Sequence, residues 1–429
     1  MKQVGVYILF SLFFVVSCVE ASPTTTASQQ GEHQAKYMQL TFNDPSWSFH
    51  LLRRMGYAPS GGADIAECLT IAEQIKEGDF QSWHDEWSKS ANKLLAFSND
   101  ALVHNHKETA KEGFFRCCNY FLASEFFLPK GTQKTELFEK ARECFIKALD
   151  HSSWQPIQIP YEGTHLPGYA YFVKSAQPAK TIILNTGYDG TAEELYFSVG
   201  FFAQKRGYNV VIFEGPGQGL PLRKQNLPFR PDWEKVIQAV VDFTVSFKEV
   251  DQSRLCLYGR SFGGNLTPRA AIHEPRIKAL IVNSPIISFL DVMEHNGLPV
   301  QLAKENPQKF DQEMTVAMER SPKVNYLISE GMWKIGGKTP SEWVHNLDKY
   351  TLQNEPELIT CPTLVVDSEE DSLVDRDQAK MFYDRLTCPK KVVLFTKETG
   401  AATHCQMGAC LYANEVIFDW LDEIFDRKV

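Results

Sequence analysis

Three features are missing from this chain of 429 residues, and each absence excludes a class of function. The chain has no run of basic residues and carries a net charge of −9 at pH 7, so it lacks the Lys/Arg surface that contacts nucleic-acid phosphates. It has no Cys-x-x-Cys or His-Glu-x-x-His sequence, the spacings that indicate a bound metal. It also has no apolar run of about 20 residues, the length of a membrane-spanning helix. We therefore expect no nucleic-acid partner and no metal ion.

The short apolar segment at the N-terminus is typical of a secretory signal peptide. A lysine precedes an apolar core at Val4–Val16, and small residues follow it. We predict a signal peptide at residues 1–21 and a polar, disordered spacer at residues 22–45. Cleavage after Ala21 would release a secreted or periplasmic protein, whereas lipidation of Cys18 would leave a membrane-tethered lipoprotein. The sequence leaves both outcomes open, with a buried N-terminal helix as a third alternative to export.

The sequence contains 10 cysteines at irregular spacing. In an exported protein such cysteines can form disulfides, but several of them stand inside apolar runs, as Cys256 does. That setting is typical of ordinary buried thiols, so we expect those cysteines to be unpaired.

The pattern of apolar residues divides the chain near residue 150. Residues 46–150 contain no clear strand-like run, and apolar side chains recur three and four positions apart, as at Trp83 and Trp87, which predicts a helical domain. In residues 151–429 an opening hairpin is followed by strands that alternate with helices, which predicts an α/β domain with a mostly parallel sheet. The runs that we interpret as strands are Thr181–Asn185, Asn209–Phe213, Leu255–Tyr258, Ala279–Val282, Thr363–Val366 and Lys391–Phe395.

The most informative segment is Leu255–Gly264, in which a strand-like run ends in Gly-x-Ser-x-Gly and leads into a helix. This pattern predicts a nucleophile elbow, a sharp turn that holds a serine hydroxyl above the sheet beside a base. The turn requires small flanking residues, which gives Gly259 and Gly263 a steric role. The alternative is an incidental serine in a glycine-rich strand end, so the interpretation depends on partners for Ser261.

Residues further along the chain supply these partners in the order serine, acid, histidine. His404 lies in a loop between the last strand-like run and an amphipathic C-terminal helix, and we predict that it is the base. The acid is expected after the strand Thr363–Val366, where five carboxylates crowd one loop: Asp367, Glu369, Glu370, Asp371 and Asp375. We choose Asp371, a few residues beyond the strand, with Glu370 as the alternative.

A tetrahedral oxyanion at this serine would need two backbone N–H donors. Phe262, the residue after the serine, supplies one, and we place the other at Tyr188, in the loop after an earlier strand. A second glycine-rich loop, Gly215–Gly219, could be taken for a dinucleotide-binding turn. Pro216 and Pro221 would break the helix that receives the pyrophosphate, so we predict no cofactor.

With these residues assembled, the chain resembles a branch of the α/β-hydrolases that includes 2,6-dihydroxypseudooxynicotine hydrolase and the fungal hydrolases that shorten polyketide pigment precursors. The resemblance covers the chain from about Trp47 to the C-terminus. The segments that carry the resemblance, in chain order, are Gly78-Asp79, Ser82-Trp83, Trp87, Gly187–Thr191, Glu193-Glu194, Gly215–Gly219, Pro231–Glu234, Pro268–Ala271 and His404–Gln406. It implies an α/β-hydrolase fold with an N-terminal helical domain over the active site, a Ser261–Asp371–His404 triad and a homodimer. A helical insertion at about 295–358 stands where hydrolases carry a lid.

Members of that branch hydrolyse esters or split C–C bonds beside ketones. The resemblance therefore implies a serine hydrolase that forms an acyl-enzyme with a small organic or polyketide-like substrate. The C–C hydrolase uses an additional carboxylate near the substrate, for which Asp291 and Glu294 are candidates beyond the strand Ala279–Val282. The alternative for these two is a pair of solvated acids on a helix. A general carboxylesterase, a peptidase of the same fold and a non-catalytic binding protein remain open as functions.

Overall fold

The computed structural model describes residues 38–149, 153–353 and 355–426. The predicted signal peptide, the lipidation alternative at Cys18 and most of the predicted spacer lie outside these residues. Within the described part of the chain, no helix is long and apolar enough to cross a membrane. The cysteines of the same part are free thiols, and all but Cys388 are buried, as expected for ordinary buried thiols.

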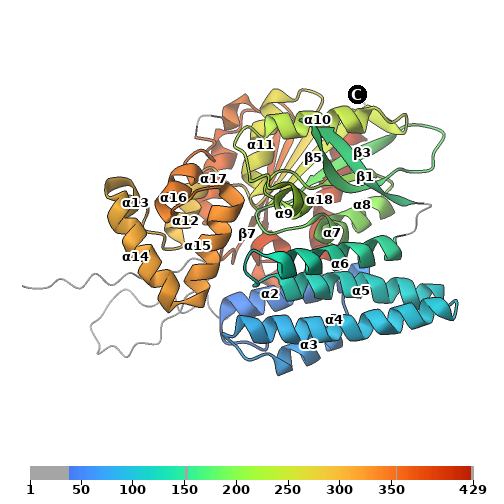
Figure 1. Ribbon diagram of the computed structural model, residues 1–429. Helices are drawn as coiled ribbons and strands as arrows, with labels where there is room; N and C mark the ends of the chain where they lie inside the picture. The colour runs from blue at the N-terminus through green and yellow to red at the C-terminus, as the bar shows by residue number, and fades with distance from the viewer. Residues whose placement is uncertain (1–37, 150–152, 354, 427–429) are drawn as a thin grey trace, which may run out of the picture.

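Eight strands of the described residues form one sheet at the centre of the molecule (Figure 1). Their order is β1-β2-β4-β3-β5-β6-β7-β8, and all neighbours pair in parallel except β1 with β2 and β2 with β4. The strands are β1 Trp154–Tyr161, β2 Thr164–Tyr171, β3 Ala179–Asn185, β4 Asn209–Phe213, β5 Val250–Arg260, β6 Ala279–Asn283, β7 Thr363–Ser368 and β8 Lys390–Phe395. The predicted mostly parallel sheet is confirmed, and β1 and β2 form the opening hairpin.

Helices cover both faces of this sheet, because successive residues of a strand point to opposite sides. In β3, Ile183 packs into the core on one face, whereas Ile182 and Leu184 pack into the core on the other. The helices of the first face are α10 (Glu234–Val245), α11 (Gly263–His273) and α17 (Arg376–Arg385), and those of the second are α8 (Phe201–Lys205) and α18 (Cys410–Phe425). Burial on both faces explains why the buried parts of the central strands are mostly apolar.

The predicted N-terminal helical region is present and lies beside the sheet (Figure 1). Its helices are α2 (Pro45–Met55), α3 (Ile65–Gln74), α4 (Phe80–Val103), α5 (Lys107–Glu125) and α6 (Thr132–Ala148). Asp44 and Asp79 begin α2 and α4 by accepting backbone N–H groups at the first turn. Trp83 and Trp87 are fully buried in the core of this region, which is what their helical spacing favours.

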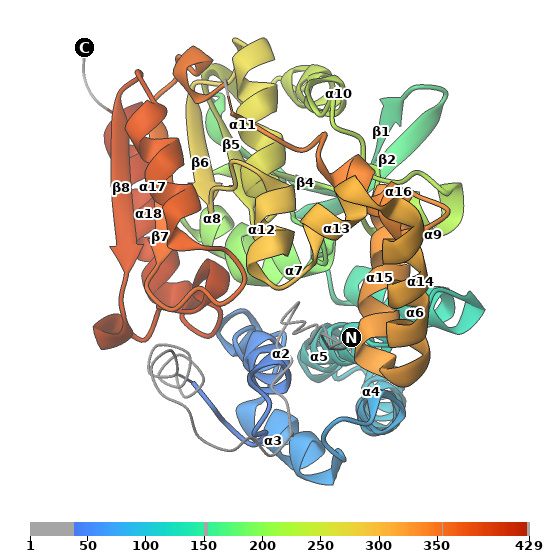
Figure 2. The same cartoon turned by 90° about the vertical axis from the view of Figure 1, so that its left-hand side faces the viewer.

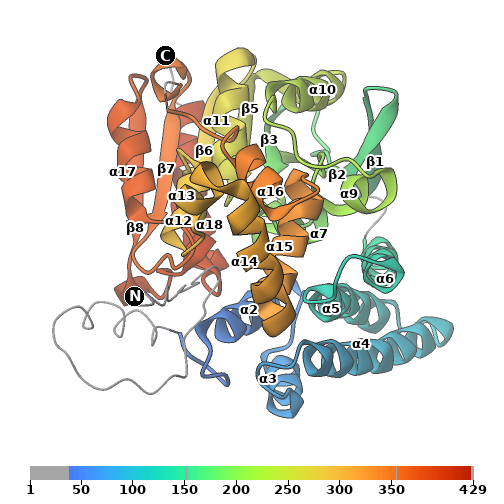
Figure 3. The same cartoon turned by 60° about the vertical axis from the view of Figure 1, so that its left-hand side comes forward.

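A second group of helices follows β6 and occupies the place of the expected lid. These helices are α12 (Phe289–His295), α13 (Val300–Glu305), α14 (Pro307–Arg320), α15 (Pro322–Ile335) and α16 (Pro340–Leu347). Three of them begin with a capping side chain followed by proline, at Asn306-Pro307, Ser321-Pro322 and Thr339-Pro340. In Figures 2 and 3, α14 and α15 extend from the sheet toward the N-terminal helices.

Buried ion pairs join the N-terminal helices to the sheet region. Glu194 of the short helix α7 (Ala192–Leu195) lies 2.6 Å from Arg53 and 2.9 Å from Arg54, both on α2. Arg142 of α6 lies 2.9 Å from Glu193, the preceding residue of α7. Burial raises the pKa of Glu194, but the two arginines outweigh it and hold the pKa at about 2. The Glu194 carboxylate is therefore charged at neutral pH and compensates the charge of two buried guanidinium groups.

Replacing Glu194 by glutamine should destabilise the fold, because it leaves both arginines buried without the carboxylate with which they form ion pairs. We expect Glu194→Gln to lower the free energy of unfolding by about 3–5 kcal/mol, measured by urea denaturation followed by circular dichroism. The control is Glu86→Gln, which removes a partner of the exposed Lys89 and should cost less than about 1 kcal/mol. Similar small losses in both variants would show that the contact between the two regions does not depend on Glu194.

Candidate active site

Ser261 lies between β5 and α11, on the sharp turn that the sequence predicts. Its φ is +57°, in the left-handed region that non-glycine residues rarely adopt. A Cβ atom at Gly259 would lie 2.1 Å from Oγ1 of Thr267, and one at Gly263 would lie 2.9 Å from the Asn185 carbonyl oxygen. Both positions therefore require glycine. The glycines allow close packing around the turn, which places Ser261 at the carboxyl end of β5.

The structure brings together Ser261, His404 and Asp371. His404 Nε2 lies 2.9 Å from Ser261 Oγ, across a separation of 143 residues. On the other side of the ring, His404 Nδ1 lies 2.7 Å from Asp371 Oδ2. The backbone N–H groups of Leu373 and Val374 donate to Asp371 Oδ1 at 3.0 and 2.9 Å and fix the carboxylate. This is the geometry in which a base activates a nucleophile while a third group orients the base.

The neighbouring carboxylates of the same loop have other partners. Glu370, the alternative acid, lies 2.6 Å from the Lys397 ammonium group. Asp367 pairs with Arg376 at 3.2 Å. Among the acids that the sequence left open, Asp371 is the one that contacts the histidine.

The charges around His404 shift its pKa. Burial lowers the pKa of His404, but the Asp371 carboxylate outweighs it and raises the pKa above the ordinary histidine value. Burial raises the pKa of Asp371, but His404 and the two N–H donors bring it below its usual value. The Cys405 thiol lies 3.4 Å from His404 Nε2. Burial raises the pKa of that thiol, but His404 lowers it to about 7.

The predicted oxyanion donors lie next to the serine. Phe262 follows Ser261 at the start of α11. The loop that carries Tyr188 packs against the elbow so closely that a Cβ atom at Gly187 would lie 2.7 Å from Ser261 Cβ. No backbone hydrogen bond within the described residues uses the N–H of Phe262 or of Tyr188. Both groups are therefore available to an oxyanion.

The N-terminal helix α2 forms one wall of the catalytic pocket. Phe49, His50 and Arg53 line the pocket from this helix, and the Phe49 ring lies 6.4 Å from the His404 ring. Sequence reasoning did not identify these residues. Their spacing places them on one face of a helix, but nothing in the local sequence shows that this face points at a serine some 200 positions later.

Asp291 and Glu294, the candidate substrate-site acids, are not among the residues that line the catalytic pocket. Both side chains are exposed on α12. The same helix turns Val292 and Met293 toward the space beside the serine. An amphipathic helix buries its apolar face, which here leaves the two acids in solvent.

The glycine-rich loop Gly215–Gly219 supports the site through Gln218. The Gln218 amide group donates to the Thr186 carbonyl at 2.9 Å, and its oxygen accepts the Gly215 N–H at 2.9 Å. The loop thereby holds the segment that carries Tyr188. Among the described residues, no cluster of His, Cys, Asp and Glu side chains could hold a metal ion.

Comparison with known proteins places the chain in a family. Residues 176–399 match the family described as serine aminopeptidase, S33. Hydrolase LUC6 of a Fusarium species is 32% identical over 90% of this chain and 98% of that protein. The 20-hydroxy-prefusarin hydrolase FUS2 of Gibberella moniliformis is 31% identical over 91% and 99%.

Solved structures show the same fold. The 2,6-dihydroxy-pseudo-oxynicotine hydrolase superimposes with a TM-score of 0.66 at 20% sequence identity, covering 87% of this chain and 97% of that one. The protein AbyA5 superimposes with a TM-score of 0.61 at 14% identity, covering 84% of this chain and 89% of that one.

A further sequence relative is named as an α/β-hydrolase. This protein, psoB of Aspergillus fumigatus, is 30% identical over 90% of this chain and 94% of its own length. The chain belongs to the α/β-hydrolase family, and it is a hydrolase.

Proposed function

We propose that this hydrolase uses Ser261 as a nucleophile and forms an acyl-enzyme. The observation that carries this proposal is the continuous line of contacts from Ser261 Oγ to His404 at 2.9 Å and from His404 to Asp371 at 2.7 Å. His404 is the base in this scheme, and Asp371 holds the ring in the tautomer whose free nitrogen faces the serine.

The reaction runs in two halves. His404 Nε2 takes the proton of Ser261 Oγ as this oxygen bonds to the carbonyl carbon of the substrate, and the N–H groups of Phe262 and Tyr188 stabilise the oxyanion. The bond to the leaving group breaks, the leaving group takes the proton from His404, and an ester remains on Ser261. A water molecule then gives a proton to His404 and attacks this ester. The acid product leaves as Ser261 recovers its proton.

The bond cleaved is proposed to be an ester or a C–C bond beside a ketone, in a small organic or polyketide-like substrate. Both bonds present a carbonyl carbon to the serine and differ in whether the proton from His404 goes to oxygen or to carbon. The family resemblance supports this substrate class, as does the name 20-hydroxy-prefusarin hydrolase of one relative. A general carboxylesterase is the alternative within the same chemistry.

An aminopeptidase activity is less well supported, although the family description contains that word. An aminopeptidase needs a carboxylate that can pair with the ammonium group of its substrate. The two carboxylates of the catalytic pocket are already paired, Asp189 with Lys334 at 2.6 Å and Glu194 with the arginines of α2. A non-catalytic binding protein is also less well supported, because binding alone does not require a histidine in contact with the Ser261 hydroxyl.

A fluorophosphonate probe tests the nucleophile directly, because it reacts with an activated serine. We expect the wild-type protein to be labelled and Ser261→Ala to remain unlabelled with its fold intact. Turnover of p-nitrophenyl acetate should fall by about 10⁴-fold or more in that variant. The control Ser253→Ala changes an exposed serine near the start of β5 and should be labelled like the wild type. Substantial turnover by Ser261→Ala would identify a different nucleophile.

The assignment of Asp371 as the acid of the triad is tested by comparing it with the neighbouring carboxylate, Glu370. Asp371→Asn is expected to lower kcat on the order of 10⁴-fold, because an amide favours the wrong tautomer of His404. Glu370→Gln removes a carboxylate that faces Lys397 instead, so its kcat should stay close to that of the wild type. Steady-state kinetics on p-nitrophenyl acetate measures both, and the reverse order of effects would assign the acid to Glu370.

The pH profile follows from the state of His404. Only its neutral form can accept the serine proton, so kcat/KM should fall as the pH is lowered through the His404 pKa. Because Asp371 raises this pKa, the midpoint should lie above the ordinary histidine value of about 6.5. In Asp371→Asn the residual activity should have its midpoint at lower pH. A midpoint that stays in place would show that Asp371 does not act on His404.

A further inference from the structure

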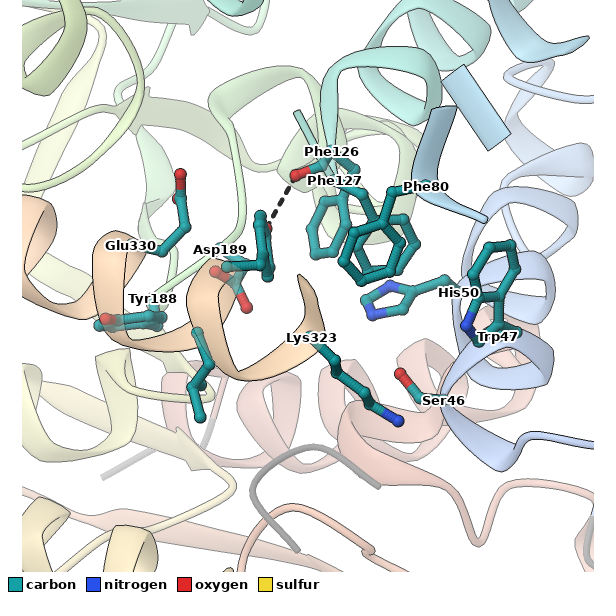
Figure 4. A pocket seen from close by; sticks show the side chains of 12 residues that line it. Ser46, Trp47, His50, Phe80, Phe126, Phe127, Tyr188, Asp189, Lys323 and Glu330 are labelled. Atoms are coloured by element: carbon teal, nitrogen blue, oxygen red, sulfur yellow. Dashed lines mark hydrogen bonds between the residues drawn. The ribbon is translucent and has the colours of Figure 1, made fainter. Parts of the chain in front are cut away.

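A second cavity, which we call the aromatic chamber, adjoins the catalytic pocket. Five aromatic side chains define it: Trp47, Phe80, Phe126, Phe127 and Tyr326. They come from α2, from the start of α4, from the segment after α5 and from α15, so the chamber lies between the N-terminal helices and the second helical group (Figure 4). The rings of Phe80 and Phe127 are stacked, with centroids 4.6 Å apart and planes 4° apart.

The chamber and the catalytic pocket have walls in common. His50, Tyr188 and Asp189 line both cavities. The two cavities therefore adjoin at these residues, one of which, Tyr188, is the proposed oxyanion donor. The aromatic walls suit a flat apolar group, because ring faces and edges pack well against other rings.

His50 is a buried polar group of the chamber without a partner. Its side chain is among the buried residues, at 6% exposure, and its Nδ1 atom is buried with no hydrogen-bond partner among the described residues. In Figure 4 the imidazole lies between the phenylalanine rings and Lys323. A buried polar group in this state is costly unless something else binds it.

His84, another buried histidine of the N-terminal helical region, differs from His50 in its hydrogen bonds. His84 of α4 has its Nδ1 atom 3.0 Å from the Ser124 carbonyl oxygen and its Nε2 atom 3.1 Å from Gln133. Both of its nitrogens are therefore satisfied by the protein. The Nδ1 atom of His50, in contrast, has no such partner among the described residues.

The ionic groups of the chamber are all paired. Lys323 lies 3.0 Å from Asp44, and Asp189 lies 2.6 Å from Lys334. Glu330 lies between two ammonium groups, those of Lys134 at 3.4 Å and Lys334 at 3.3 Å, although neither of its buried carboxylate oxygens makes a hydrogen bond.

His50 itself is uncharged, because burial lowers its pKa well below the usual value and the nearby arginines Arg53 and Arg54 lower it further. Neutral imidazole can donate one hydrogen bond and accept one. The chamber thus offers a hydrogen bond but no unpaired charge. A carboxylate bound there would find no free cation, whereas a carbonyl or hydroxyl oxygen would find a partner.

We propose that the aromatic chamber binds a flat, uncharged aryl or conjugated part of the substrate, and that His50 selects substrates with a carbonyl or hydroxyl oxygen on that part. This inference rests on the proposed function, since it assigns the substrate class of the same active site. His50 acts on specificity and not on the bond that is cleaved.

A series of p-nitrophenyl esters that differ only in the aryl group tests whether the protein selects substrates with an oxygen on that group. Each carries an aryl group at the end of its acyl chain, as phenyl, 4-acetylphenyl or 4-carboxyphenyl, over a series of chain lengths. A parallel set carries the aryl group on the alcohol side of an alkyl ester, so that either side of the bond can enter the chamber. We expect the wild type to prefer acetylphenyl over phenyl by about tenfold in kcat/KM at the best length, and to disfavour carboxyphenyl.

Variants assign this preference to His50. In His50→Phe, which keeps a flat ring, the acetylphenyl-to-phenyl ratio should fall to about one. His50→Gln keeps a donor and an acceptor and should retain part of the preference. The control His84→Gln alters a histidine outside both cavities and should keep the wild-type ratio. A wild type that cleaves the esters without preference at any length would overturn the proposal, as would a preference that survives in His50→Phe.

A binding measurement separates this inference from the proposed mechanism. Acetophenone is titrated by calorimetry into Ser261→Ala and into the same variant carrying His50→Phe. We expect binding to be weaker by about tenfold in the double variant, whether or not the wild type cleaves esters. Equal affinities would overturn the role of His50. Absence of fluorophosphonate labelling together with a His50-dependent affinity would instead overturn the proposed mechanism alone.

Discussion

The position of α2 is the constraint on which both cavities depend. Arg53 and Arg54 on this helix meet Glu194 of α7 in a buried cluster, and the same helix carries Phe49 and His50 into the cavities. Buried ion pairs contribute little net stability, because desolvation offsets their attraction, but a misplaced partner is costly. Both ion pairs form where α2 lies over the catalytic pocket.

The chemistry and the selectivity of the site come from different parts of the chain. Ser261, His404 and Asp371 follow strands β5, β8 and β7 at the carboxyl ends of the sheet, where open α/β sheets place their ligands. The five aromatic side chains that define the aromatic chamber come from the two helical regions outside that sheet. Substitutions in those helices can change the substrate while the proposed reaction stays the same. This separation is consistent with one fold hosting many substrates.

Two segments of the proposed site have a left-handed backbone. Ser261 has a φ of +57°, and Cys405 and Gln406, directly after His404, have φ values of +52° and +51°. Asn283 holds both strained segments, since its carbonyl accepts the Ser261 N–H at 2.5 Å and its side-chain amide donates to Gln406 at 2.7 Å. Asn283, at the end of β6, thus forms hydrogen bonds with both the serine turn and the histidine loop. Strained conformations persist only where the surroundings determine them this strongly.

Local sequence patterns predict the features that arise within a few residues of each other. Alternating apolar runs predict the parallel sheet, and glycines at fixed spacing around Ser261 predict its turn, because strand period and turn geometry are local properties of the backbone.

Long-range packing places Asp371, and not Glu370, against His404, leaves Asp291 and Glu294 in solvent, and brings His50 into a cavity beside the serine. These outcomes depend on which face of one element meets another far along the chain. Such packing is set by the balance of burial and charge pairing over the whole molecule, and no short segment of sequence contains it.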